Sequence, residues 1–377
     1  MIDFDPVAFR RDLHAHPETG FEVTRTAGRI ADVLERAGLE VARDVGGAGV
    51  VATLHRGGQA IGLRADMDAL PIVEANTFSH RSRDDGRFHG CGHDGHSTML
   101  LAAALKLASD TRLDRTVHFL FQPDEENGNG AAAMIADGLF ERFPMSEIYG
   151  LHNMPGLELG RFGIQEGPFC AFEDNFEIHL TGRGGHSSMP ESGVDAIVAG
   201  AGLVMQLQTI VSRAVPAGEH AVVSVTGFET DGARNVLAGR VQITGDCRGF
   251  SELVSTRMET RMREIVQGVA AAQGAEASLS YSTSFRPLVN DPQCTRRAAD
   301  AAALGAQVNR AYGRVGFSED FAEFLLHRPG AFILMGNGTE GAQAMPLHNP
   351  GYDFNDAAMP HGVAFWCNLA LGGAGAA

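Results

Sequence analysis

Hydrophobic residues in the first part of the chain follow two patterns, helical spacing in some segments and short β-rich runs in others. Residues 24–37 show the first pattern, because Ala27, Ile30 and Leu34 share one face and Gly38 follows as a stop signal. The expected elements alternate, with helices at 5–14, 24–37, 96–109 and 131–138 and strands at 50–54, 60–63, 116–121 and 147–150. This alternation predicts an α/β fold with an open sheet and helices on both faces.

The middle third of the chain has a different order of elements. Residues 175–180 alternate as a strand, and residues 196–211 place Ile197, Val204 and Leu207 on one face of a helix. The other expected elements here are strands at 221–228, 240–246 and 277–282 and a helix at 252–272. The resulting order β-α-β-β-α-β is typical of a ferredoxin-like unit.

We expect this unit to be inserted into the first domain. After it, the chain returns to a helix, a strand and a helix, at 293–310, 331–335 and 355–370. The prediction is therefore a discontinuous first domain, residues 1–175 and 287–377, and an inserted domain, residues 176–286.

Composition and charge exclude several classes of protein. A length of 377 residues favours two domains, and a formal net charge of −16 argues against a nucleic-acid groove, which needs a basic surface. Apolar runs stay short of the roughly 18 residues of a membrane span, and the N-terminus has no signal-peptide pattern. Five scattered cysteines make a disulfide framework improbable. We therefore expect a cytoplasmic protein with no membrane or nucleic-acid partner.

Ligand-type side chains follow several of the expected strands. Glu125 and Glu126 come directly after the strand ending at Phe121. Of two neighbouring carboxylates in a loop, one can bind a metal while the other transfers a proton. Most such pairs are merely solvated surface. Cys91, His93, His152 and His348, however, also stand in segments marked by glycine or proline. Open α/β sheets bind ligands beyond the carboxyl ends of their strands, so these residues together predict a metallohydrolase.

The spacing of Cys91 and His93 allows both side chains to face one point. A thiolate with an imidazole suits zinc, cobalt, nickel or manganese rather than calcium. For a cysteine alone, a small buried hydrophobic role would be the simpler interpretation. Asp66 and Asp68 have the same i, i+2 spacing, and could be ligands or carboxylates that orient histidine ligands.

Long motifs spread over nearly the whole chain make a family resemblance specific. They are RDLHAHPE (11–18), RADMDALP (64–71), CGHDGH (91–96), FQPDEE (121–126), LHNMPG (151–156), GRGGHS (182–187), SEDF (318–321) and LHNP (347–350). In these motifs the chain resembles the M20 metallopeptidase superfamily, in the amidohydrolase subgroup of hippurate hydrolases, N-acyl-amino-acid amidohydrolases and plant auxin-conjugate hydrolases. The resemblance implies a zinc-peptidase-like catalytic domain with an open mixed sheet, plus an inserted ferredoxin-like lid and dimerisation domain.

The resemblance also implies the roles of the site residues. Cys91 would be the bridging thiolate between two divalent ions per subunit (manganese, zinc, cobalt or nickel), and Glu125 the general base that acts on the metal-activated water and then protonates the leaving amine. Asp68 matches the carboxylate that orients a ligand. The implied metal ligands are Cys91, His93, Glu126, His152 and His348.

Three residues of the inserted domain match further parts of the superfamily's site. His186 would reach into a partner subunit's site and stabilise the oxyanion, which implies a homodimer or larger homo-oligomer. Asn235 and Arg248, on either side of the strand at 240–246, match the binders of the substrate carboxylate. A loop histidine, an edge asparagine and a fold-stabilising arginine are the structural alternatives.

The chain departs from the family pattern at Asp124, where a small residue is usual, and at Asn127 and Asn129, where glycines are usual. Asp124 could favour a substrate that carries an amine, or it could be a surface acid. The remaining histidines, such as His55 and His80, are expected to be structural or exposed.

The sequence thus predicts a metal-dependent amidohydrolase that cleaves a small N-acyl amino acid or a related conjugate. A di- or aminopeptidase of the same superfamily is the nearest alternative. A non-catalytic binding protein on this scaffold would have lost Glu125 or several ligands, and none is lost. A zinc deaminase is disfavoured, because its His-x-Glu and Pro-Cys-x-x-Cys motifs are missing.

Overall fold

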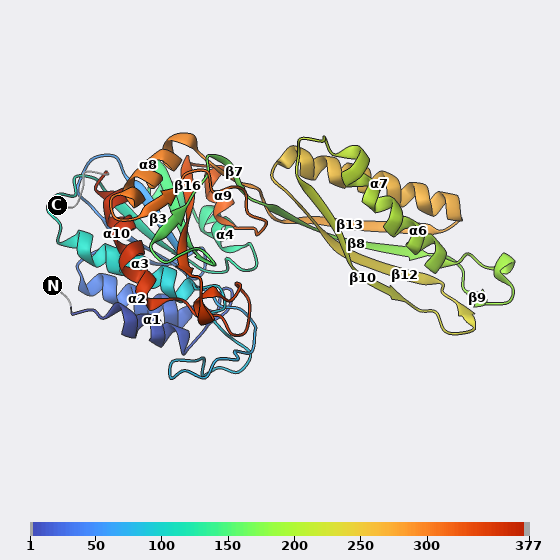
Figure 1. The fold of residues 1–377 in the computed structure, drawn as a ribbon, viewed down its shortest axis with the longest axis horizontal. Helices are drawn as coiled ribbons and strands as arrows, with labels where there is room; N and C mark the ends of the chain where they lie inside the picture. The colour runs from blue at the N-terminus through green and yellow to red at the C-terminus, as the bar shows by residue number, and fades with distance from the viewer. Residues whose placement is uncertain (1–2, 373–377) are drawn as a thin grey trace. The chain divides into compact units, whose positions relative to one another are not determined.

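The computed structural model describes residues 3–372, which form two compact units. The first unit contains Met1–Phe169, Val289–Gly313 and Asp320–Ala377, and the second contains Cys170–Leu288 and Arg314–Glu319. Residues 314–319 join the second unit because the backbone N–H of Ala171 donates to the carbonyl of Phe317 and Cys170 pairs with Val315. The two units are connected by several passages of the chain (Figure 1).

The first unit is built on an eight-stranded mixed sheet in the order β1-β2-β4-β3-β5-β16-β6-β15. Its central strands β4, β3, β5 and β16 are parallel, and they are almost entirely buried, as parallel strands covered on both faces require. The mixed sheet predicted for this fold class is confirmed. The strands are β1 Glu40–Val45, β2 Gly49–Leu54, β3 Ile61–Asp66, β4 Val117–Gln122, β5 Glu147–Pro155, β6 Arg161–Gly163, β15 Gln307–Asn309 and β16 Gly330–Gly338.

Helices α1, α2, α3 and α10 gather on one side of this sheet, where α3 packs against α1 and α10, while α4 and α9 pack together elsewhere (Figure 1). The helices are α1 Pro6–His14, α2 Thr24–Arg36, α3 His93–Ala108, α4 Gly130–Ala136, α5 Leu139–Arg142, α8 Pro292–Ala303, α9 Phe321–Leu325 and α10 Met359–Ala370, with 3-10 turns η3 Gly341–Ala344 and η4 Asp356–Ala358. The helix expected at 293–310 ends at Ala303, and β15 follows; that part of the prediction was wrong. Leu304 is half exposed and Gly305 follows it, so the apolar pattern that extended the predicted helix is not on a buried face.

The second unit has the predicted element order β-α-β-β-α-β. Its four strands form an antiparallel sheet in the order β10-β12-β8-β13, with α6 and α7 packed on it through residues such as Leu203, Met258 and Ile178. Its main elements are β8 Phe172–Thr181, α6 Ala196–Thr209, β10 Ala221–Thr230, β12 Arg240–Gly249, α7 Glu252–Gln273 and β13 Glu276–Phe285. Its smaller elements are β9 Gly185–His186, η1 Pro190–Ser192, the π-turn η2 Ile210–Ala214 and β11 Val236–Leu237, while β7 Gly167–Cys170 pairs with β14 Leu288–Asn290 where the chain passes between the units.

The expectation that every apolar run is too short for a membrane span is wrong at helix α6. Together with η2 it forms a stretch, Ala196–Ala214, that by length and composition alone could cross a membrane, although about a third of it is buried. One face of α6 accounts for the buried part, because Ala199, Leu203 and Leu207 pack into the core of the second unit. Residues Ile197, Val198 and Met205 of the same helix are exposed.

Candidate metal centre

The five predicted ligands come from four segments of the first unit. Gly92 has a φ of 92°, in the left-handed region that glycine adopts easily, and this turn makes His93 the first residue of α3. His152 lies within β5, Glu126 in the loop after β4, and His348 in the loop after β16, where it adopts a φ of 65°.

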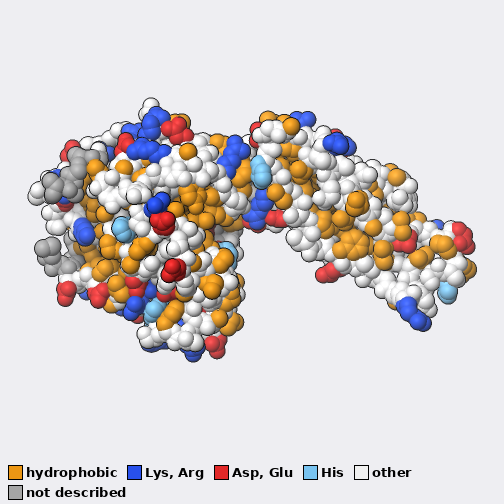
Figure 2. Space-filling model, in the orientation of Figure 1, with side chains coloured by type: hydrophobic (Ala, Val, Ile, Leu, Met, Phe, Trp, Pro, Cys, Tyr) orange, Lys and Arg blue, Asp and Glu red, His pale blue; other side chains and the backbone are white. Residues whose placement is uncertain are grey.

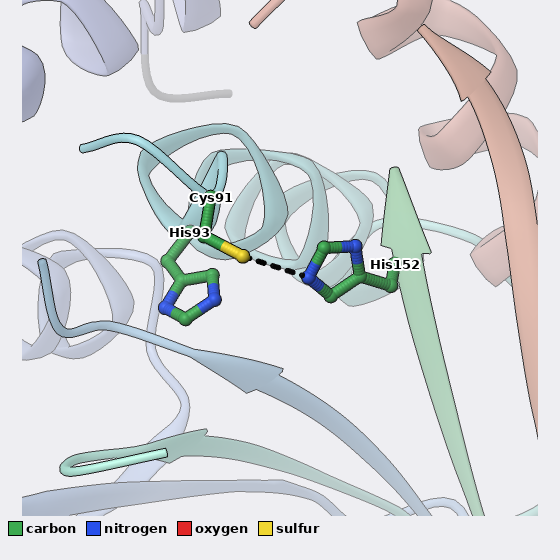
Figure 3. Close-up of side chains that lie close together, drawn as sticks. All are labelled: Cys91, His93 and His152. Carbon is green, nitrogen blue, oxygen red and sulfur yellow. Dashed lines mark hydrogen bonds between the residues drawn. The ribbon is translucent and has the colours of Figure 1, made fainter. Parts of the chain in front are cut away.

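The ligand atoms of these residues form two overlapping groups. Cys91, His93 and His152 have ligand atoms within 4.8 Å of one another, and so do Cys91, Glu126 and His348. Figure 3 shows the first group, with the Cys91 sulfur pointing towards the Nε2 atom of His152 at 3.3 Å. The thiol of Cys91 thus belongs to both groups, which is the arrangement that a ligand shared by two ions requires.

Both buried histidines present the same ring nitrogen to this centre. His93 donates through Nδ1 to the carbonyl of Asp68 at 2.8 Å, and His152 donates through Nδ1 to the carbonyl of Asn153 at 2.6 Å. When either ring is neutral, these bonds keep its proton on Nδ1 and leave the lone pair on Nε2, the usual state of a histidine that binds a metal.

Two buried atoms in the centre lack a hydrogen-bond partner among the described residues. They are Nε2 of His93 and Oε1 of Glu126, and they lie 3.8 Å apart. Buried polar atoms are nearly always satisfied, so a pair of this kind that is too far apart for a hydrogen bond marks a place for another atom. An imidazole nitrogen and a carboxylate oxygen are both common ligands of zinc and related ions. The residues therefore fit a divalent cation.

Burial and nearby charges set the protonation of these side chains when no cation is bound. Burial, together with the charges of Glu126 and Glu125, raises the pKa of the Cys91 thiol well above its usual value. Burial lowers the pKa of His152 well below its usual value, whereas for His93 the carboxylates of Asp66, Asp68 and Glu126 outweigh burial and raise the pKa to about 10. A cation at the centre would favour the thiolate and replace the proton on His93, as metal binding generally does.

Two aspartates at or just after the end of β3, Asp66 and Asp68, support the predicted ligands and the residues around them. The carboxylate of Asp68 accepts the backbone N–H groups of Glu125 at 3.0 Å and Glu126 at 3.2 Å and so fixes both glutamates, while its backbone carbonyl accepts from His93. Asp66 accepts from Nδ1 of His96 at 2.7 Å and from Arg64 at 2.8 Å. These bonds match the orienting role, while the group Asp66, His93 and His96 could also hold an ion, so both roles of Asp66 stay predictions.

The sequence did not single out His96 or Asn153, which support the ligands from behind. Nε2 of His96 accepts the backbone N–H of Asn153 at 3.0 Å, and the Asn153 side chain donates to the carbonyl of Cys91 at 2.6 Å. The hydroxyl of Tyr352 in turn donates to Asn153 at 2.6 Å. The i, i+3 spacing of His93 and His96 was the only sequence signal for this network.

A second buried polar network lies beside the metal ligands. His14 bonds Asp94 at 2.8 Å and Glu74 at 3.2 Å, and Arg10 bonds Asp94 at 3.2 Å. Burial opposes a charge on His14, but its bonds to Asp94 and Glu74 outweigh burial and raise the pKa to about 9. Because Asp94 follows the predicted ligand His93, the network fixes the first turn of α3.

The prediction of Asp124 as a surface acid is wrong, while its effect on a substrate amine stays a prediction. Its side chain is buried, and its two carboxylate oxygens accept from the amides of Asn127 at 2.5 Å and Asn129 at 2.9 Å. The three residues that depart from the family pattern thus contact one another.

The predicted substrate-binding residues of the second unit lie in two separate places. His186 on β9 pairs with Val236 on β11, and the N–H of Ser187 donates to the carbonyl of Asn235, so His186 and Asn235 are neighbours. Arg248 lies near the opposite end of β12 from this pair. Ten strand residues span about 30 Å, so one small molecule cannot touch both places in a single chain.

All three guanidinium nitrogens of Arg248 have partners within the second unit. Nε donates to Asp246 at 2.8 Å, Nη1 to the hydroxyl of Ser318 at 2.8 Å, and Nη2 lies 2.7 Å from Glu173. An anion that binds here must compete with these two carboxylates.

Comparison with known proteins gives a consistent result. Residues 62–372 match the model of the peptidase family M20/M25/M40. The chain is 35% identical to an N-acetylcysteine deacetylase of Bacillus subtilis over 97% of this chain and 96% of that protein, and 35% identical to a hippurate hydrolase of Campylobacter jejuni over 96% and 94%. Among solved structures, a dinuclear metal binding peptidase of the M20 family from Bacillus subtilis superposes with a TM-score of 0.84 at 31% identity, covering 97% of this chain and 96% of that one.

Proposed function

Because the chain belongs to the peptidase family M20/M25/M40, we propose that it is a metal-dependent amidohydrolase that cleaves the amide bond of a small N-acyl amino acid or related conjugate. The observation that carries the proposal is the thiol of Cys91, which is common to two groups of ligand-type side chains. The names of the relatives, a deacetylase and a hippurate hydrolase, support an N-acyl amino acid as the substrate class.

We assign two divalent ions to these groups. Cys91 would contribute to both, with His93 and His152 holding one ion and Glu126 and His348 holding the other. When bound, the ions supply Lewis-acid activation of the attacking water and of the amide carbonyl. A thiolate, imidazoles and a carboxylate suit zinc, manganese, cobalt or nickel.

Glu125 is the general base in this proposal. Its carboxylate is buried, lies 3.9 Å from Nε2 of His93, and is held through its backbone N–H by Asp68. It accepts a proton from the attacking water as the carbon–oxygen bond forms, and returns that proton to the leaving nitrogen as the carbon–nitrogen bond breaks. The products are a carboxylic acid and an amine.

The test is a panel of N-acetyl amino acids, N-benzoyl amino acids and dipeptides, each assayed with manganese, cobalt and zinc. N-acyl amino acids should be hydrolysed fastest, and Glu125→Gln should lower kcat by about 10²–10⁴-fold with both ions retained. Faster hydrolysis of dipeptides would establish the peptidase alternative. A chain that binds these compounds but hydrolyses none of them would be a binding protein.

We further propose that the second unit completes the site across a homodimer, as a lid and dimerisation domain. The distance between the predicted substrate-binding residues supports this proposal. His186 and Asn235 lie near one end of β12 and Arg248 near the other, so all three contact one substrate only if two subunits contribute. Helix α6 offers an apolar surface for a partner, with Val198 and Met205 exposed, and hydrophobic side chains are visible on this unit in Figure 2.

Mixing two inactive chains, Glu125→Gln and His186→Ala, tests the contribution in trans. A mixed dimer contains one intact site and regains about half of the wild-type activity per dimer, by symmetry. The matched control is Glu125→Gln mixed with itself after the same treatment. If mixed dimers form and stay inactive, the role of His186 in trans is refuted.

All five cysteines are free, which supports our placement of the enzyme in the cytoplasm.

A further inference from the structure

Asp124 immediately precedes the general base and has an unusual backbone conformation. Its φ is 50°, in the left-handed region that side chains rarely adopt but that aspartate tolerates when it bonds locally. Its backbone N–H donates to the carbonyl of Gly20 at 3.2 Å, and its own carbonyl accepts from Asn129 at 3.2 Å and Gly130 at 3.1 Å. The backbone turns sharply here, so that β4 ends and the loop with Glu125 begins.

The side chain of Asp124 ties this turn together. Oδ1 accepts from the Asn127 amide and Oδ2 from the Asn129 amide, so one carboxylate spans the loop from the residue before the base to the residue before α4. The carboxylate also lies over Gly20, where an added Cβ would come within 2.9 Å of Oδ1. The side chain is 2% exposed, so water does not compete effectively for these bonds.

Two carboxylates therefore hold the pair Glu125–Glu126 from opposite directions along the chain. Asp68 binds the backbone N–H groups of both glutamates, and Asp124 binds the asparagines that follow them. The Asp68 carboxylate also faces the ring of His93, with Oδ1 3.6 Å from Nδ1. The loop that carries Glu125 and Glu126 is thus bridged by the bonds from Asp124 to Asn127 and Asn129.

We propose that Asp124, through Asn127 and Asn129, is a positioning residue that fixes Glu125 and Glu126 in this chain. The proposal rests on the proposed function for the role of Glu125, but its effect on the ligand Glu126 can be measured without a substrate. Residues that position metal ligands typically change metal affinity or activity by about 10–100-fold when removed.

The experiment compares Asp124→Ala, Asp124→Gly and Asp124→Asn. Glycine accepts the left-handed backbone but has no carboxylate, whereas asparagine keeps the conformation and one acceptor, and can donate to Asn127 once that amide turns. We expect alanine and glycine to lower kcat about tenfold with KM within about twofold, and asparagine to keep about half of kcat. Asp44→Ala is the matched control, because Asp44 has a φ of 59° but is exposed and far along the chain from the site.

The second measurement is titration of the metal-free protein with Co²⁺, followed by absorption of its bond to the Cys91 thiolate. Asp124→Ala and Asp124→Gly should raise the dissociation constant about tenfold, and Asp44→Ala should leave it unchanged. If either Asp124 variant fails to fold, the double variant Asn127→Ala, Asn129→Ala removes the same bonds from exposed positions. Wild-type kcat and Co²⁺ affinity in Asp124→Gly would overturn the proposal. A wild-type chain that hydrolyses no N-acyl amino acid would overturn the proposed function alone, since the Co²⁺ result is independent of substrate.

Discussion

Replacing His14 with glutamine should remove a pH-dependent part of the stability of the first unit. The imidazole is fully buried between Asp94 and Glu74, with Arg10 alongside, and His80 and His89 are the other titratable rings that face it. Its pKa is about 9 in the folded chain, against 6.5 for the ordinary group. Because the folded pKa is raised, the charged form stabilises the fold fully below pH 6.5, and this contribution is lost as the pH rises through about 9.

The magnitude follows from the shift. A difference between 6.5 and about 9 corresponds to about 3 kcal/mol, since one pKa unit is about 1.4 kcal/mol. No discount for solvent screening applies, because the His14 side chain has no exposed surface. Asp94 stays ionised over this range, since Arg10 and His14 outweigh burial and hold its pKa far below the usual value.

The assay is urea unfolding between pH 6 and pH 10, followed by tryptophan fluorescence. Trp366 is the only tryptophan of the chain and is buried in α10, so the signal reports on the first unit. The free energy of unfolding should fall by about 3 kcal/mol more in the wild type than in His14→Gln over this range. His55→Gln, at an exposed histidine, should behave as the wild type does. Parallel curves for the wild type and His14→Gln would refute the reasoning.

Three further predictions concern the two units. Cys91→Ala should lower the metal content from about two ions per chain to about one or fewer, measured by atomic absorption; an unchanged content would exclude a shared thiolate. Glu173→Gln removes one competitor for Arg248, so KM for N-acyl amino acids should fall by up to about fivefold at constant kcat, and an unchanged KM would count against carboxylate binding by that arginine. Gly95→Ala places a Cβ 2.4 Å from the ring of Phe354, and should cost about 2 kcal/mol in the same fluorescence assay; wild-type stability would show that the ring can shift.

Much of the centre could be predicted because its signals are short-range. The spacing of Cys91 and His93 and the position of Glu125 and Glu126 after a strand are local, and the structure brings these residues together with His152 and His348. The partners that orient them are long-range and have no such signal: Tyr352 supports Asn153 across about 200 residues, and its role depends on the folded sheet.

The difference between local and long-range signals also explains the predictions that were wrong. A surface acid was one of the two interpretations of Asp124, but the amides of Asn127 and Asn129 satisfy its carboxylate in a buried position. The helix predicted at 293–310 was extended too far because the apolar pattern continues past its real end at Ala303. Periodicity gives the existence and type of an element better than its ends, which depend on tertiary contacts.

The order of strands in the first sheet has a consequence for synthesis on the ribosome. β16 lies between β5 and β6 but is made more than 150 residues after them, once the whole second unit has left the ribosome. Until residues 330–338 emerge, β5, which carries His152, has an open edge, and His348 follows later still. The second unit, whose strands and helices are contiguous in sequence apart from residues 314–319, can fold first. A nascent chain stalled before β16 therefore lacks a central strand of the sheet and one of the predicted ligands, His348. The unpaired edge of β5 is then the place where such a chain can aggregate.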